Sequence, residues 1–146
     1  SDLALGEADG LTVCFGESDG EPFQRTGAPV PELGVVDLCA APDPAAAAEA
    51  AMARDLATPL DPTRDPLVRE TLFILGPGRH VWYQRIHHLV IDGYGFDLLT
   101  RRIAGLYTAR LTGDAPGPSL SPYGDLLAED AAYRLSGGAA ALFSVR

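Results

Sequence analysis

Two apolar segments joined by a short turn constrain the fold of this chain most strongly. Residues 67–75 (LVRETLFIL) and 80–88 (HVWYQRIHH) are rich in aliphatic and aromatic side chains, which favour extended structure. Between them lies Gly76-Pro77-Gly78-Arg79, a sequence typical of a tight turn. We therefore expect the two segments to form an antiparallel hairpin.

Shorter strand signals precede this hairpin. Residues 11–15 are apolar, residues 16–21 form turns readily, and residues 22–25 complete a second expected hairpin. Residues 34–39 are a further strand candidate. Residues 59–66 carry three prolines and are expected to be irregular.

Helical signals fall in three segments. Asp43 is a favourable N-cap before Pro44, and residues 45–57 are rich in strong helix formers. From Gly93 to Thr112, apolar side chains recur three and four residues apart, as in an amphipathic helix, and residues 123–135 are helical in character. Residues 137–146 show no clear period. Together these elements indicate one α/β sandwich domain, with a mixed, mainly antiparallel sheet flanked by helices.

The composition excludes several classes of protein. The chain is 47% hydrophobic and 21% charged, which is typical of a folded domain, and its net charge is −9. Because no basic patch is available to neutralise phosphates, we expect no nucleic-acid partner. No apolar run approaches the roughly 20 residues that cross a bilayer. The acidic start lacks the basic region of a signal peptide, so we expect a cytoplasmic protein without a membrane partner.

The remaining singular residues have ordinary structural interpretations. Cys14 and Cys39 lie in apolar surroundings and are expected to be reduced core thiols. Trp82 and Tyr94 are expected in the core, although they could line a channel. The arginines at 101, 102 and 110 are expected on a solvated helix face.

The segment that carries chemistry is HHLVIDG, from His87 to Gly93, where a strand gives way to a helix. If the strand continues to residue 88, His88 shares a face with Trp82 and Gln84 and His87 faces the other way. Adjacent strand positions do not suit one metal ion, and only one further histidine, at position 80, exists, so we expect no metal site.

Helix N-terminal amides disfavour an imidazolium nearby, so a neutral His88 could act as a base near neutral pH. Asp92 is expected to be the N-cap of the following helix, and Gly93 is expected where the chain turns tightly. Gly93 and Gly95 could also let a substrate approach the backbone.

HHLVIDG matches HHxxxDG, and the chain resembles the condensation domains of non-ribosomal peptide synthetases, particularly those of siderophore-type synthetases. The flanking segments PLDPTRDPLVRETLFIL and YQRIHH, with YGF after the motif, add to the likeness, which covers roughly residues 11–133. The resemblance implies a chloramphenicol acetyltransferase-like fold, of which residues 1–146 form a single partial domain, the amino-terminal lobe. The carboxy-terminal lobe is expected to be absent from this chain.

The resemblance also implies an activity. In this family, the amine of a downstream carrier-bound aminoacyl group attacks an upstream carrier-bound acyl or peptidyl thioester and forms an amide. His88 is then the central catalytic residue, as a base or as a group that orients the amine. His87 supports local structure, Asp92 is structural, and Gly93 lines the channel for the carrier arm.

The implied partners are the upstream and downstream peptidyl carrier proteins, the missing lobe and an adjacent adenylation domain. No cofactor is expected to bind directly, because the substrates ride on 4'-phosphopantetheine arms. The alternatives are an epimerisation domain, an acetyl-CoA-dependent acetyltransferase, and a non-catalytic module that docks carrier proteins. A heterocyclisation domain is disfavoured, because that group has Asp where this chain has His87.

Overall fold

The structure, a computed structural model, describes residues 2–136. The elements in chain order are α1 (Asp2–Glu7), the 3-10 turn η1 (Asp9–Thr12), β1 (Cys14–Ser18), β2 (Glu21–Arg25), β3 (Leu33–Asp37), α2 (Pro44–Ala57), β4 (Val68–Gly76), β5 (Arg79–Ile86), α3 (Gly93–Thr112) and α4 (Tyr123–Leu135). The expected helices and the later expected strands are present, with small shifts at their ends. The first strand was expected at residues 11–15 but lies at Cys14–Ser18, because residues 11 and 12 belong to η1 and residues 16–18, expected in a turn, continue the strand. The helix α1 and the turn η1 were not expected. The expectation for residues 137–146 lies outside the described residues.

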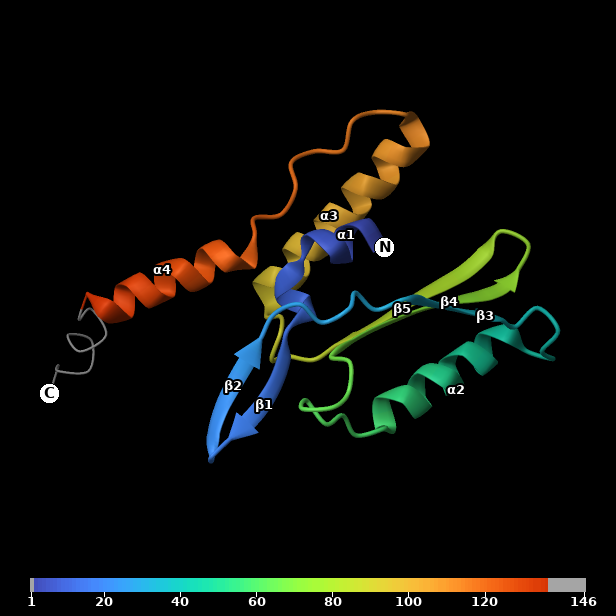
Figure 1. The fold of residues 1–146 in the computed structure, drawn as a ribbon. Coiled ribbons are helices and arrows are strands. Elements are labelled where there is room, and N and C mark those ends of the chain that lie inside the picture. Colours follow the sequence, from blue (N-terminus) through green and yellow to red (C-terminus); the bar gives the residue numbers. More distant parts are fainter. Residues whose placement is uncertain (1, 137–146) are drawn as a thin grey trace, which may run out of the picture.

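The strands form two separate sheets (Figure 1). β1 and β2 make an antiparallel hairpin, whereas β3, β4 and β5 form a three-stranded sheet in that order. β3 runs parallel to β4, and β4 runs antiparallel to β5 from the rung Val68–Ile86 to the turn. At that turn Gly78 has a φ of 66°, a conformation that glycine adopts without strain. The expected mixed, mainly antiparallel sheet flanked by helices is confirmed.

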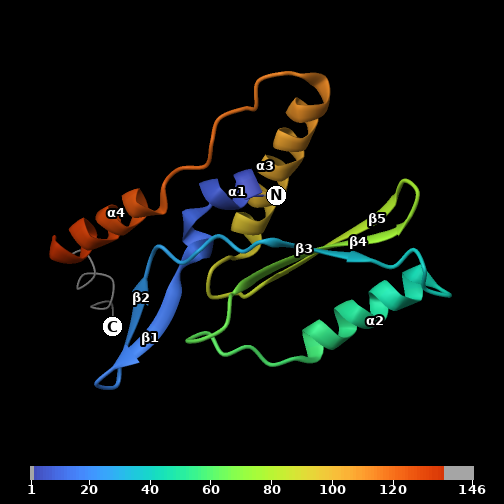
Figure 2. The same cartoon turned by 45° about the vertical axis from the view of Figure 1, so that its right-hand side comes forward.

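Helix α2 packs along one face of the three-stranded sheet (Figure 2). As expected from the sequence, Asp43 caps this helix by accepting a hydrogen bond from the Ala46 amide at 3.0 Å. The buried side chains of Ala48, Phe73 and Leu75 form the core between helix and sheet. This core holds the turn end of the β4–β5 hairpin against α2.

A second core lies at the opposite end of the hairpin, where α1, η1 and α3 meet. It is built from four buried side chains, namely Leu5, Leu11, Val68 and Leu99. Beside it, Arg102 of α3 donates two hydrogen bonds of 2.7 Å to Glu7 and one of 2.7 Å to the Gly117 carbonyl. The Arg102 side chain is only 9% exposed, so its placement on a solvated face was wrong. Arg101 is exposed and pairs with Asp97 one turn away.

Three further expectations about burial were wrong. Trp82 is 40% exposed because it points to the face of the sheet opposite α2, and Tyr94 is 72% exposed in the first turn of α3. Cys39 is exposed because β3 ends at Asp37, two residues before the expected end. Its amide donates to the Asp37 carboxylate at 2.9 Å, while Cys14 is half-buried.

Replacement of Phe73 by alanine tests the core between α2 and the sheet. Phe73 is 4% exposed, so the substitution leaves a cavity and is expected to lower the free energy of unfolding by about 3–5 kcal/mol. Leu111→Ala, at a side chain 69% exposed on α3, should change it by no more than about 0.5 kcal/mol. Urea denaturation of both variants measures the difference, and equal effects would refute this assignment of the core.

Candidate active site

The HHLVIDG motif forms the connection between β5 and α3. β5 ends at Ile86, but the ladder gains one more bond, because the His87 amide donates to the Leu67 carbonyl at 2.8 Å. Residues 88–90 then form a turn, and α3 begins at Gly93. The expected strand from residue 80 to residue 88 was therefore too long. His88 lies in the turn, so the face it was expected to share with Trp82 and Gln84 does not apply.

His87 holds this turn through both its backbone and its side chain. Its carbonyl accepts a hydrogen bond from the Val90 amide at 3.1 Å. Its imidazole Nδ1 accepts another from the Leu89 amide, also at 3.1 Å. An Nδ1 atom that accepts an N–H cannot carry a proton, so a neutral His87 has its proton on Nε2. His87 thus determines the shape of the turn that displays His88.

His88 and Gly93 lie on the open side of the turn. Both residues are exposed, and no hydrogen bond to the His88 imidazole is present within residues 2–136. A Cβ atom built on Gly93 would meet no atom within 4 Å. The imidazole and the backbone at the start of α3 are therefore both accessible to a ligand from outside this chain.

Asp92 is the N-cap of α3, as the sequence predicts. Its carboxylate accepts a hydrogen bond from the Gly95 amide at 2.7 Å, and its carbonyl accepts one from the Phe96 amide at 2.9 Å. Gly95 has a packing reason to be glycine, since a Cβ there would lie 3.1 Å from the Ile91 side chain and 3.3 Å from the Asp92 carboxylate. The Asp92 carboxylate is therefore engaged in a structural hydrogen bond that caps the helix.

A charged cluster, which we call the Asp55 clamp, joins the end of α2 to the strands that lead to the motif. It consists of Asp55, Arg69, Tyr83 and Arg85. The Asp55 carboxylate accepts hydrogen bonds from Arg69 and, at 2.9 Å, from the Tyr83 hydroxyl, and it lies 3.4 Å from Arg85. This cluster was not predicted from the sequence, although charged residues within apolar strands could have signalled it.

The clamp changes the ionisation of its members. Burial opposes ionisation of Asp55, but the Tyr83 hydrogen bond and the charges of Arg69 and Arg85 outweigh it, so the pKa of Asp55 falls below its ordinary value of 3.8. Burial, together with the hydrogen bond to Asp55, raises the pKa of Tyr83. Asp55 is therefore an anion and Tyr83 a neutral hydrogen-bond donor at neutral pH.

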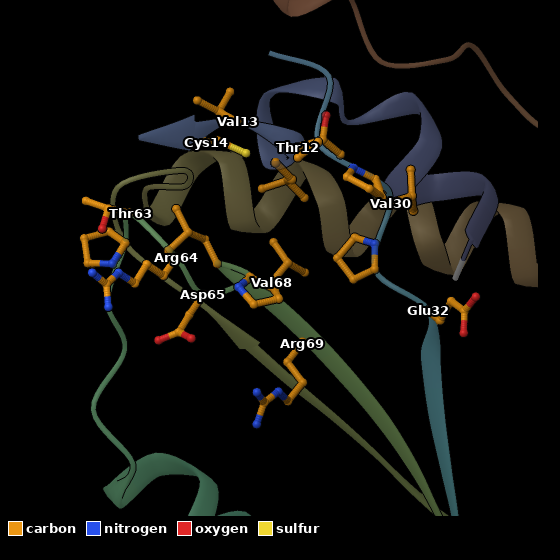
Figure 3. Close-up of a pocket in the computed structure, with 17 residues that line it drawn as sticks. Thr12, Val13, Cys14, Val30, Glu32, Thr63, Arg64, Asp65, Val68 and Arg69 are labelled. Atoms are coloured by element: carbon orange, nitrogen blue, oxygen red, sulfur yellow. The ribbon is translucent and has the colours of Figure 1, made fainter. Parts of the chain in front are cut away.

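Two hollows adjoin the motif. One, of about 510 Å³, has apolar walls that include Leu67 and Val68, with Arg64, Asp65 and Arg69 also among its lining residues (Figure 3). It borders the motif through Leu67, whose carbonyl binds the His87 amide. The other, of about 530 Å³, is lined by Val90 and Ile91 of the motif, by Gly95 of α3, and by residues of η1 and the start of α4.

No helix among the described residues has the length and apolar character needed to span a bilayer. Within residues 2–136 no group of three or more His, Cys, Asp or Glu side chains is arranged to hold a metal ion.

The chain that contains this strand, turn and capped helix belongs to a known family. The model of the family described as "Condensation domain" matches residues 5–139, and the chain is a member of that family. The family resemblance seen in the sequence is thereby confirmed.

Relatives give the same result. Over 130 residues the chain is 45% identical to the dimodular nonribosomal peptide synthase of Bacillus subtilis. The match covers 88% of this chain and 6% of that protein. The chain is 36% identical over 138 residues to enterobactin synthase component F of Escherichia coli, covering 90% of this chain and 10% of that protein. The crystal structure of the starter condensation domain of rhizomide synthetase matches with a TM-score of 0.80 and 38% identity, over 90% of this chain. The match covers 34% of that crystallised chain, so the present chain spans about a third of it.

Loss of the cap tests the structural role of Asp92. Asp92→Ala removes the bond to the Gly95 amide and is expected to lower the free energy of unfolding by about 1 kcal/mol. Asp97→Ala, on the same helix, removes only an exposed ion pair with Arg101 and should cost about 0.3–0.5 kcal/mol. Denaturant titrations compare the two, and an Asp92→Ala variant as stable as wild type would contradict the cap.

The lowered pKa of Asp55 predicts how the stability of the fold depends on pH. A carboxyl group whose pKa is depressed by folding stabilises the fold above its unfolded value, here about 3.8, and loses this contribution as the pH falls through the lower folded value. Wild type should therefore exceed Asp55→Asn in stability at neutral pH, and the difference should shrink below pH 3.8. Thermal unfolding across this range measures it; a constant difference would refute the ionised clamp.

Proposed function

We propose that this chain is the amino-terminal lobe of a condensation domain that forms amide bonds in non-ribosomal peptide synthesis. The observation that carries the proposal is the motif turn, which displays an exposed His88 between the end of β5 and the capped start of α3. Family membership supports the same conclusion. Because the chain spans about a third of its structural relative, the carboxy-terminal lobe would lie outside it.

The reaction follows from the chemistry of the two substrates. The downstream amine attacks the carbonyl carbon of the upstream thioester, so that a C–N bond forms and the C–S bond breaks. The amine loses a proton, and the departing sulfur gains one and leaves as a thiol. His88 would take the proton from the amine and pass it to the departing sulfur, or it would orient the amine by accepting its hydrogen bond.

In this proposal the neighbouring motif residues hold the backbone around His88 and leave space beside it. His87 fixes the turn through the bonds to Leu67, Leu89 and Val90. Asp92 orders the start of α3, and the open space at Gly93 leaves room for a carrier arm beside His88. None of the three needs to contact the reacting atoms.

The substrates would arrive on 4'-phosphopantetheine arms of an upstream and a downstream peptidyl carrier protein, with an adenylation domain adjacent in the assembly. The acidic net charge of −9 does not favour acidic carrier proteins by long-range attraction. Arg101 and Arg102 are both held by acidic side chains of this chain. Docking would therefore depend on local shape and on surfaces supplied by the rest of the domain.

A grafted domain tests the proposal. Residues 5–139, which the family model matches, would replace the matching segment of the starter condensation domain of rhizomide synthetase, a structure that this chain matches with a TM-score of 0.80. The chimera would receive an acyl-carrier donor and an aminoacyl-carrier acceptor, and mass spectrometry would follow the amide. We expect His88→Ala to slow amide formation by about 10² to 10⁴-fold, the range for loss of a general acid–base group.

His80→Ala is the matched control, because this exposed histidine lies at the far end of β5 and should leave the rate unchanged. Full activity of His88→Ala would refute the catalytic role of His88. A folded chimera that inverts the loaded residue and forms no amide would replace the proposal with epimerisation.

A further inference from the structure

The strand that presents the motif carries a charge conflict close to its end. In the β4–β5 ladder Arg69 lies directly opposite Arg85, two residues before His87. Like charges at directly opposed positions destabilise an antiparallel pair. The hairpin therefore needs a counter-charge at this rung if its two strands are to stay paired up to the motif.

Asp55 supplies that counter-charge from a different element. Its carboxylate bonds Arg69 and lies 3.4 Å from the Arg85 guanidinium, and its side chain is only 14% exposed. The charge is thus largely shielded from solvent. Screening of an ion pair is weaker at such a position than at the surface. The Tyr83 hydroxyl completes the contacts of this carboxylate at 2.9 Å.

Arg85 also fastens the strand to the backbone of α2. Its guanidinium donates to the Asp55 carbonyl at 2.5 Å and to the Thr58 carbonyl at 2.8 Å. These carbonyls lie at the carboxy-terminal end of α2, and the Asp55 carbonyl also accepts the Thr58 amide at 3.1 Å, so Arg85 is a second donor to it. A planar guanidinium can serve two acceptors at once, which a lysine ammonium does with less geometric control.

We propose that Asp55 and Arg85 are positioning residues for His87 and His88. This inference rests on the proposed function, since it concerns the motif that would perform the reaction. The clamp sets where β5 ends relative to α2, and the next residues of the chain are the two histidines. The His87 amide donates to the carbonyl of Leu67, the residue before the partner strand β4. This bond completes the last rung of the ladder.

Nuclear magnetic resonance of the imidazole groups tests this role in the chain itself, without an activity assay. The chain has three histidines, and only His87 and His88 adjoin the clamped end of β5. His80 pairs with Ile74 at the other end and serves as an internal reference. With ¹⁵N-labelled histidine, we expect Asp55→Asn to shift or broaden the His87 and His88 signals and to leave those of His80 unchanged.

A second substitution separates positioning from general loss of stability. If the uncompensated Arg69–Arg85 pair causes the change, the double variant Asp55→Asn, Arg69→Gln removes the repulsion and should return the His87 and His88 signals toward wild type. Arg101→Gln is the control for loss of an exposed arginine and should move none of the three. If Asp55→Asn fails to fold, Arg85→Lys, which keeps the charge, takes its place and should show the same selective shift.

Unchanged His87 and His88 signals in a folded Asp55→Asn or Arg85→Lys variant would overturn the inference, as would equal shifts of all three histidines. These results do not depend on amide formation, so the positioning role and the proposed function can fail separately. In the active chimera, a positioning role also predicts that Arg85→Lys lowers kcat more than it raises KM.

Discussion

The antiparallel ladder between β4 and β5 is the constraint on which the rest of this structure depends. One face of the hairpin supplies Phe73 and Leu75 to the core beneath α2, and its open end supplies Val68 to the core beneath α3. Its last bond, from the His87 amide to the Leu67 carbonyl, reaches into the motif itself. The same ladder therefore contributes to both hydrophobic cores and fixes where the turn that displays His88 begins.

The residues of the motif divide into those that make the turn and those that the turn exposes. His87 and Asp92 use their side chains for local hydrogen bonds, and Gly95, two residues after the motif, is confined by Ile91 and Asp92. His88 and Gly93 remain open on the surface of this chain. The proposed function needs such a division, with the reaction centre completed by protein outside these residues; the matching starter condensation domain is about three times as long as this chain.

Local signals in the sequence were sufficient for most of the elements, though not for α1, η1 or the bounds of β1, and for the N-caps at Asp43 and Asp92 and the family. They were insufficient for features that depend on contacts between distant segments. Arg102 was expected in solvent because its helix shows a polar face there, yet Glu7, 95 residues earlier, buries it. The Asp55 clamp brings α2 to β4 and β5, and Trp82 is exposed because α2 covers the other face. His88 was placed in the strand because the apolar pattern continues past Ile86, where the hydrogen-bonded turn takes over.

Hydrogen exchange at the His87 amide tests most directly whether the ladder extends into the motif. We expect this amide to exchange much more slowly than an unprotected loop amide, as do the β5 amides that donate to β4, because it donates to Leu67 across the last rung. The His88 amide, which donates no hydrogen bond within residues 2–136, should exchange quickly. If the His87 amide exchanged at the rate of an unprotected loop in the folded chain, the hairpin would not hold the motif, and the central claim would be wrong.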